Sequence, residues 1–446
     1  MTDGTAGGGD GRIGTREAAA RLGVKPETLY AYVSRGLLGS RRAAGGRGST
    51  FDPAEVAALA ARGRAGAGAP GTASSASSTS DGPAEGWGRI RTGITLIDAA
   101  TDTYAFRGVD AVALAEAYAY EEVAQWLWTG ELRVGMRFGA PPLPLAAARA
   151  AAGSLPAGSG PMDRMRVAVI AAGAADPLRF DLTREAVLGC ARGLIPTLVD
   201  ALPPAGRTDV PRDAPPPAGG ADTPGDAPIA RRLWPRLTAR EPDPASLRVL
   251  DAALALLIDH DLATSTLAVR VAATGRAHPY AAVSAGLGAL DGPLHGQASA
   301  LAHRMLADVL AGGSAGPVVA AQLRAGQRVP GLGHRLYRGE DPRARLLLAL
   351  LADVPAAADA LAAARDVVAT AARHTALHAN VDLALGVLSV ASGMPPEAGE
   401  AVFAVGRTAG WIAHALEEYG EQALRLRPTG VYVGAAAPQP LPLTRG

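Results

Sequence analysis

The chain has 446 residues, a formal net charge of +1, a single cysteine, and 48% hydrophobic residues of which few are aromatic. One cysteine excludes an intrachain disulfide framework and any site with several cysteine ligands, and the small net charge gives no global reason to expect a polyanionic partner. The hydrophobic residues are mainly Ala, Leu and Val, which predicts a helix-rich protein of two or three domains. We expect a cytoplasmic location, because no secretory signal or membrane-length apolar run is apparent.

Residues 13–64 show the pattern of two short helices separated by a tight turn. Thr15 is placed to cap a helix that ends before Gly23, and Pro26 stands in the first turn of a second helix. Residues 45–51 could add a small wing. The pattern resembles the MerR-type winged helix-turn-helix, which implies DNA-facing side chains at Tyr30, Tyr32, Arg35, Arg41 and Arg42.

Charge and composition also set this segment apart. Residues 1–64 hold ten Lys/Arg and six Asp/Glu, and a basic face suits contact with phosphates. The alternative is a protein-interaction module that no longer binds DNA. Residues 65–86 are rich in Gly, Ala, Ser and Pro, which predicts a flexible linker. We therefore expect a second domain at 87–446, with an exposed Pro-rich loop at 203–228.

The second domain is predicted to be almost entirely helical. A short strand or hairpin near Ile94 comes first. Hydrophobic periodicity and capping residues then predict helices near 114–127, 144–153, 161–173, 183–201, 231–240, 243–276, 297–311, 343–353, 356–375, 383–393 and 397–424.

Ionisable residues interrupt the apolar pattern at two of these places. Asp259-His260-Asp261 lies within the most apolar helical segment, where charged groups must be paired. The three residues could satisfy one another, cap neighbouring helices or bind a ligand. His295 lies between Gly-Pro-Leu and Gly296, directly before a predicted helix whose dipole favours a neutral imidazole.

A glycine-rich loop at 329–344 carries further candidates. Gly331 and Gly333 allow positive φ and close approach to a ligand. His334 can donate a hydrogen bond to a carbonyl, and Arg343 can bind a carboxylate in bidentate fashion. The alternative is a polar surface loop between helices.

A carboxylate and an arginine complete the set. Asp382 precedes an apolar helix, where it could act as a base or merely as an N-cap. Arg407 lies among small residues, which suggests a buried anion. The sequence has no His-Glu-x-x-His, Walker or Gly-x-Ser-x-Gly pattern. A carboxylate beside neutral histidines suits proton abstraction next to a carbonyl, and several arginines suit a substrate with more than one carboxylate.

Residues from about 88 to 434 resemble the citrate synthase family. The matching segments are Asp259-His-Asp261, Gly292-Pro-Leu-His-Gly296, Gly331-Leu-Gly-His-Arg-Leu-Tyr337, Asp341-Pro-Arg-Ala344, Asn380-Val-Asp382, Arg407 with Gly410-Trp-Ile-Ala-His414, and Arg427-Pro428. The resemblance implies an all-α fold with a large helical domain and a smaller one, roughly 290–400, that closes over substrate.

The resemblance also implies a reaction. Asp382 would abstract a proton from acetyl-CoA or propionyl-CoA, His295 would hold the thioester oxygen, and His334 would polarise the keto group of oxaloacetate. The product would be citrate, as in the tricarboxylic acid cycle, or 2-methylcitrate, made by a homodimer that needs no metal or cofactor. Oxaloacetate would be bound by His260, Arg343, Arg407 and the partner subunit's Arg427, and CoA by Arg338.

Some positions depart from the family pattern. Asp261 stands where Glu is usual, Gln297 and Ser299 alter the segment after His295, and Thr429 replaces an Arg. These departures leave the preferred acyl-CoA open. The alternative function is a DNA-binding regulator that uses the synthase-like domain as a metabolite sensor, although a sensor would not need a proton-abstracting base.

Overall fold

The chain divides into two units, Met1–Ala84 and Glu85–Gly446. The structure is a computed structural model that describes residues 12–22, 24, 29, 33, 38–42, 49–57, 90–205, 227–292 and 295–434. The predicted linker at 65–86 lies outside these residues, as does most of the Pro-rich loop at 203–228.

The first unit combines a short helix with a three-stranded sheet. Strands β1 (Ile13–Gly14), β2 (Ser40–Arg42) and β3 (Ser49–Phe51) pair antiparallel in the order β1-β3-β2. Helix α1 (Thr15–Leu22) begins where the sequence predicts and turns Ala18 and Ala19 into a small apolar core. The β2–β3 hairpin starts earlier than the predicted wing. Tyr30, Tyr32 and Arg35 lie outside the described residues, as does the side chain of Arg42.

A small sheet opens the described part of the second unit. Strands β4 (Thr95–Asp98), β5 (Thr103–Phe106) and β6 (Val109–Asp110) pair antiparallel in chain order. The sheet buries Tyr104 and Phe106, and the Tyr104 hydroxyl donates a hydrogen bond to the Leu256 carbonyl. This contact fixes the hairpin against the end of a helix that precedes the candidate site.

The rest of this unit is helical, as predicted. The helices are α4 (Ala111–Ala117), α5 (Tyr120–Thr129), α6 (Pro142–Gly153), α7 (Pro161–Ala175), α8 (Arg184–Asp200), α9 (Ile229–Leu237), α10 (Pro244–Leu256), α11 (Thr264–Thr274), α12 (Pro279–Leu290), α13 (Ala298–Gly312), α14 (Ala315–Arg324), α15 (Pro342–Leu351), the 3₁₀ turn η1 (Pro355–Ala357), α16 (Ala358–Ala371), α17 (Val381–Ala391) and α18 (Ala398–Gly420).

Two of the predicted helices are wrong in extent. The segment 114–127 belongs to α4 and α5, which are separated at Tyr118 and Ala119, because the Glu122 side chain accepts the Ala119 N–H and starts a new helix. The segment 243–276 is two helices, α10 and α11, with Asp259–Asp261 in the connection between them. Helices α12 and α14 were not predicted.

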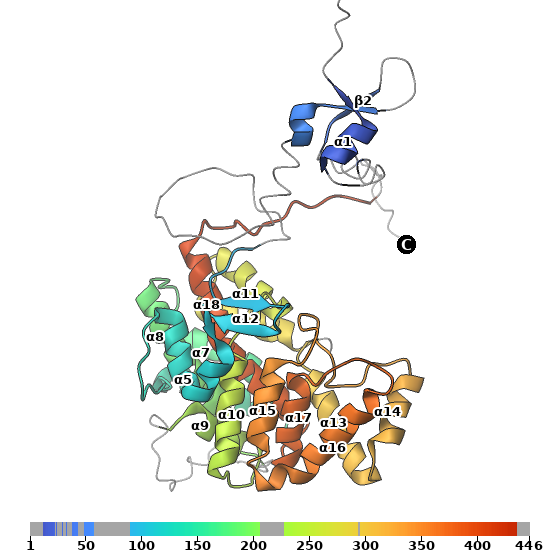
Figure 1. The fold of residues 1–446 in the computed structure, drawn as a ribbon. Coiled ribbons are helices and arrows are strands. Elements are labelled where there is room, and N and C mark those ends of the chain that lie inside the picture. Colours follow the sequence, from blue (N-terminus) through green and yellow to red (C-terminus); the bar gives the residue numbers. More distant parts are fainter. Residues whose placement is uncertain are drawn as a thin grey trace, which may run out of the picture. The chain divides into compact units, whose positions relative to one another are not determined.

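Helix α18 forms the centre of the second unit (Figure 1). It packs against α5, α8, α10, α11 and α12, and almost every residue of its first five turns is buried. Gly406 and Gly410 allow the close approach of α10, since a Cβ at Gly410 would overlap the Ile258 carbonyl oxygen. The chain just after α10 is therefore held directly against α18.

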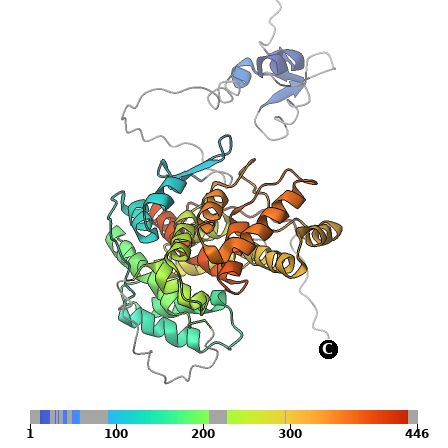
Figure 2. The same cartoon turned by 60° about the horizontal axis from the view of Figure 1, so that its bottom comes forward.

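A second group of helices lies beside this centre. Helices α13, α15 and α16 pack against α17, and α14 packs against α16 (Figures 1 and 2). Helix α15 also contacts α10. The candidate site lies where the connection after α10 and the middle of α18 meet the loop before α15 and the start of α17.

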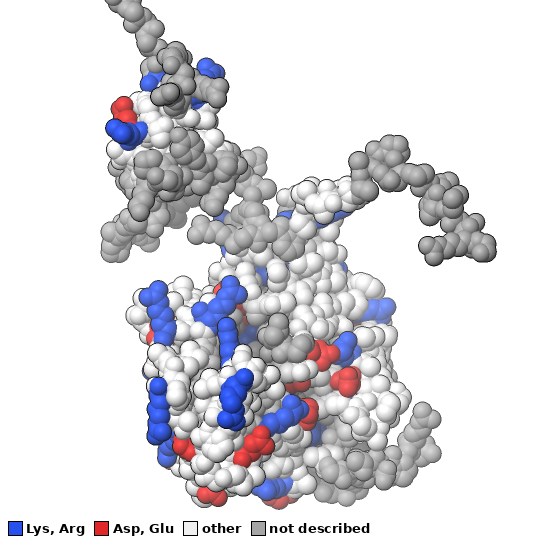
Figure 3. Space-filling view, turned by 90° about the vertical axis from the view of Figure 1, so that its right-hand side faces the viewer, with Lys and Arg blue, Asp and Glu red and all other residues white. Residues whose placement is uncertain are grey.

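The surface of the second unit carries both signs of charge. On the face shown in Figure 3, basic and acidic side chains are interspersed, and in places they adjoin one another. Among the described helices, none alone is long and apolar enough to span a membrane, and Pro342–Leu351 with Pro355–Ala371 passes that test only as a pair bent by 115°.

Candidate active site

The loop at 329–344 is fastened to the segment that precedes Asp382. The Asn380 N–H donates to the Gly331 carbonyl (2.9 Å), and the Gly333 N–H donates to the His378 carbonyl (2.7 Å). Gly331 and Gly333 have φ values of 77° and 81°, in the region that favours glycine. A Cβ at Gly331 would lie 2.8 Å from Cβ of Leu383. The glycines thus bring His334 beside the start of α17, and the surface-loop alternative is not supported.

Arg343 is buried in a bidentate ion pair with Asp341. Nε of Arg343 lies 3.0 Å from Oδ1 and Nη2 lies 2.8 Å from Oδ2. Asp341 also accepts the Val381 N–H at 3.1 Å. Burial would raise the pKa of Asp341, but Arg343 keeps it below its usual value. The pair fixes the orientation of the guanidinium and leaves Nη1 outside these contacts.

His334 is held as a neutral ring. Its Nδ1 accepts the Leu336 N–H at 3.1 Å, and a neutral imidazole with an accepting Nδ1 carries its proton on Nε2. Burial, with a contribution from Arg343, lowers its pKa to about 4. Nε2–H is therefore a donor at physiological pH, as electrophilic activation of a carbonyl requires.

His260 packs against His334 and Tyr337. Its Nε2 lies 2.7 Å from the Tyr337 hydroxyl, and its ring meets that of His334 edge-on with centroids 5.0 Å apart. Burial lowers the pKa of His260 far below its usual value, and Arg343, His334 and Arg407 lower it further. The cluster therefore consists of neutral imidazoles beside permanent cations.

Arg407 supplies a buried positive charge without a full set of partners. Its Nε donates to the Leu257 carbonyl at 2.8 Å, and its Cζ lies 4.6 Å from the centre of the Phe403 ring. Nη1 is buried and has no hydrogen-bond partner among the residues that the structure describes. Burial lowers its pKa to about 10, while Asp259 opposes the shift. A buried unpaired donor on a cation is costly, so the arrangement suits an anionic ligand.

His295 approaches the same region from the turn before α13. Its Nε2 lies 2.8 Å from the buried Ser265 hydroxyl, in the first turn of α11. Burial and the nearby Arg407 lower its pKa to about 4. The preceding residues, Pro293 and Leu294, lie outside the described residues. His295 is thus a neutral group next to the buried arginine, as predicted.

Asn380, not Asp382, is the N-cap of α17. Its side-chain oxygen accepts the N–H groups of Asp382 and Leu383 at 3.0 and 3.4 Å. The capping alternative for Asp382 is therefore wrong, and its carboxylate is released from that role. Burial and Asp341 raise the pKa of Asp382 to about 6, against the effect of Arg343. A carboxylate with such a pKa is a stronger base than an ordinary aspartate, and it is still mostly ionised at pH 7.

The remaining predicted residues lie elsewhere. Arg338 is exposed, with its backbone N–H bonded to Asp102. Arg427 is exposed on the tail after α18. Asp261 is exposed and has φ of 59°, so the expectation of three buried ionisable groups holds only for Asp259 and His260.

Sequence reasoning placed Tyr337 and Ser265 in segments that match the family but gave neither a role in the site. Each contacts one of the histidines by a single side-chain hydrogen bond, and their identity alone gives no signal. Asp341 could have been found, because an Asp directly before Pro and two residues before Arg343 is a good helix cap. Within the described residues, no three His, Cys, Asp or Glu side chains are grouped as a metal site would require.

Comparisons with known proteins point in one direction. Residues 84–429 match the family described as "Citrate synthase, C-terminal domain", and residues 15–61 match "MerR HTH family regulatory protein". A "Putative citrate synthase 2" from Mycobacterium tuberculosis is 38% identical over 212 residues, which are 45% of this chain and 55% of the relative. A "Citrate synthase" from Acidithiobacillus ferridurans is 32% identical over 206 residues, or 44% of this chain and 53% of that one. The chain thus spans about half the length of the curated relatives it matches.

Solved structures agree with the sequence relatives. The citrate synthase from Pyrobaculum aerophilum has a TM-score of 0.64 and 26% identity, covering 80% of this chain and 92% of that one. The citrate synthase from Thermotoga maritima has a TM-score of 0.61 and 25% identity, covering 82% and 98%. The likeness extends over most of the second unit.

Proposed function

Because the chain belongs to the citrate synthase family, and carries a MerR-type helix-turn-helix at its N-terminus, we propose that it condenses an acyl-CoA with oxaloacetate. The acyl-CoA is acetyl-CoA or propionyl-CoA, and the product is citrate or 2-methylcitrate with release of CoA. The reaction needs no resident metal or cofactor. The observation that carries the proposal is the buried Arg407, whose unpartnered Nη1 lies among neutral histidines and a second buried arginine.

Oxaloacetate is the ligand that this cluster fits. Its two carboxylates match Arg407 and the free Nη1 of Arg343, with His260 as a neutral donor. Nε2–H of His334 then points a hydrogen bond at the keto oxygen. This polarisation leaves the keto carbon open to attack by a carbon nucleophile.

Asp382 generates that nucleophile. Its carboxylate removes a proton from the α-carbon of the acyl group, while His295 donates a hydrogen bond to the thioester oxygen as negative charge develops there. The α-carbon attacks the keto carbon of oxaloacetate, and the keto oxygen takes up a proton. Water then cleaves the thioester of the resulting citryl-CoA, giving the carboxylate and the free CoA thiol.

The proposal assigns further roles outside the buried cluster. Arg338 is exposed on the loop at 329–344 and would contact the CoA phosphates. Arg427, on the exposed tail, would enter the site of a second copy in a homodimer. Both roles rest on the family resemblance and on the exposure of the two side chains.

Release of the CoA thiol tests the proposed reaction. Purified full-length protein should liberate thiol only when oxaloacetate is present with acetyl-CoA or propionyl-CoA, and the ratio of the two rates gives the acyl preference. Binding of oxaloacetate without any turnover would overturn the enzyme assignment and favour the metabolite-sensor alternative.

A second candidate function rests on the first unit. The match over residues 15–61 and the exposed Arg41 on strand β2 support binding to DNA, with the second unit reporting oxaloacetate or acyl-CoA. Full-length protein should shift DNA from its own upstream region in a salt-sensitive manner. Arg41→Ala should weaken the shift, whereas no shift at low salt would leave this unit an interaction module.

A further inference from the structure

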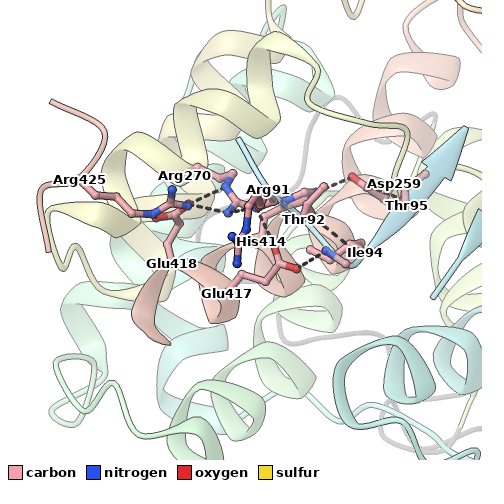
Figure 4. Close-up of polar contacts among 11 residues, drawn as sticks. Arg91, Thr92, Ile94, Thr95, Asp259, Arg270, His414, Glu417, Glu418 and Arg425 are labelled. Carbon is pink, nitrogen blue, oxygen red and sulfur yellow. Dashed lines mark hydrogen bonds and ion pairs between the residues drawn. The ribbon is translucent and has the colours of Figure 1, made fainter. Parts of the chain in front are cut away.

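A largely buried polar network joins α18 to α11 and to Asp259, the residue directly before His260 (Figure 4). Arg270 on α11 donates to Glu418 and to Glu417, at 2.6 Å in each case. Its Nη1 also lies 2.8 Å from Nδ1 of His414, and Nε2 of His414 lies 3.2 Å from Oδ1 of Asp259. We call Asp259, Arg270, His414, Glu417 and Glu418 the α18 clamp.

The proton positions in the clamp follow from the donors. An arginine can only donate, so Nδ1 of His414 accepts and Nε2–H donates to Asp259. Burial would raise the pKa of Asp259, but His414, Arg407 and the hydrogen bond from Thr95 hold it below its usual value. Asp259 is therefore a buried carboxylate whose charge is satisfied without a substrate.

The clamp holds the backbone on which His260 stands. Asp259 is bound to α18, while the next side chain, His260, contacts Tyr337 and His334. Asp261 follows with a left-handed φ of 59°. A non-glycine residue in that region is strained and persists only where its surroundings hold it firmly.

The same clamp fixes the far end of this segment. Arg270 lies on α11 beyond Ser265, whose hydroxyl contacts His295. Asp259 and Arg270 thus fasten residues 259–270 to α18 at two points. Between these points lie His260, which is part of the site, and Ser265, which contacts His295. A shift of either point would displace a hydrogen-bonding group of the site.

Two other parts of the chain join the clamp (Figure 4). The Thr95 hydroxyl donates to Asp259, and the Gly93 N–H donates to Glu417 at 2.8 Å. Nη2 of Arg270 donates to the Arg91 carbonyl at 3.4 Å. Arg425, at the root of the C-terminal tail, is paired with Glu418. Residues 91–95 and the start of the C-terminal tail therefore both contact the charged side chains of the clamp.

We propose that the α18 clamp is a positioning device that sets His260, and through Ser265 His295, in the geometry that binds oxaloacetate and acyl-CoA. None of its side chains needs to touch substrate. The inference rests on the proposed oxaloacetate site for its functional consequence, but the mechanical role of the clamp stands on the contacts themselves.

Two substitutions of His414 separate positioning from packing. His414→Leu keeps an apolar side chain in the core but removes both hydrogen bonds. His414→Gln retains one acceptor and one donor, so it can bridge Arg270 and Asp259. Arg133→Ala, which removes an exposed ion pair with Glu131, is the control for loss of an arginine pair elsewhere.

Two measurements on the full-length variants test the clamp. Hydrogen–deuterium exchange of the backbone at 257–267 should rise in His414→Leu and stay near wild type in His414→Gln and Arg133→Ala. Oxaloacetate affinity should fall about tenfold in His414→Leu, as expected when a buried carboxylate loses a hydrogen bond, and recover in His414→Gln.

The outcomes are distinguishable. Unchanged exchange at 257–267 in a folded His414→Leu protein would overturn the clamp. Equal losses of affinity in the Leu and Gln variants would also overturn it, because packing alone would then explain the effect. A wild-type protein that binds no oxaloacetate would refute the proposed function, and the exchange measurement would still decide whether the clamp positions this segment.

Discussion

The two halves of the candidate site are built differently. On the side proposed to bind oxaloacetate, His260, Arg343 and Arg407 are buried, and each is held by a hydrogen bond to another part of the site: to Tyr337, Asp341 and the Leu257 carbonyl, respectively. On the side proposed to bind the acyl-CoA, Asp382 lies at a helix start and His295 in a turn, and the His295 side chain has one hydrogen bond, to Ser265, and an edge contact with the Phe403 ring. The side chains of the first half are therefore fixed before a ligand binds, whereas those of the second half make few hydrogen bonds within the protein.

The largest effect is expected on the acyl side, from Asp382→Asn. The substitution keeps the shape of the side chain but removes the base, so turnover should fall about a thousandfold. Oxaloacetate affinity should stay close to that of wild type, because the buried arginines are untouched. Thiol-release kinetics and an oxaloacetate titration measure the two quantities, and a variant with normal turnover would refute the role of Asp382.

The second effect is expected on the oxaloacetate side, from Arg407→Met. Methionine preserves much of the buried volume but removes the cation, and loss of one partner of a buried charge pair should weaken oxaloacetate binding about a hundredfold. Arg338→Ala is the matched control, since it should raise KM for acyl-CoA and leave oxaloacetate affinity unchanged. If Arg407→Met binds oxaloacetate as well as wild type does, the assigned carboxylate contact is wrong.

The two halves also differ in how far the sequence could predict them. His260, Asp382 and Arg407 could be predicted as site residues, because an ionisable group among apolar or small residues is costly to bury unless it has a partner or a ligand. The choice between Asn380 and Asp382 as the cap of α17 could not be made, because both side chains are suited to it and only the backbone geometry decides.

The break between α10 and α11 illustrates what the sequence leaves open. Hydrophobic periodicity continues through 243–276 and predicts one helix, but Gly410 brings α18 against Ile258, and Thr95, 164 positions before Asp259, binds its carboxylate. These are tertiary contacts between remote segments, which override local propensity. The helix-rich character, in contrast, followed from composition and periodicity, and the all-α class from the family resemblance.

A pH profile of the unmodified protein tests whether Asp382, and not a histidine, is the base. Asp382 must be ionised to act as a base, and its pKa is raised to about 6, so kcat/KM should fall as the pH drops through about 6. His295 and His334 have pKa values near 4 and stay neutral over that range. A single limb near pH 6 is therefore expected, and an acid limb found only near pH 4 would contradict the assignment of the base.

The smallest effect concerns Glu400, in the first turn of α18 beside Gly296. Burial, with Asp291, Glu397 and Asp163, raises its pKa to about 7 from 4.5. A carboxyl whose folded pKa is raised contributes stability that is full below the unfolded pKa and is lost as the pH rises through the folded pKa. Glu400→Gln should therefore raise the free energy of unfolding by about 2 kcal/mol at pH 8 and leave it nearly unchanged at pH 4. Denaturant unfolding at both pH values measures this difference, and an equal change at both would show that the buried Glu400 carboxylate beside Gly296 is not the group that titrates.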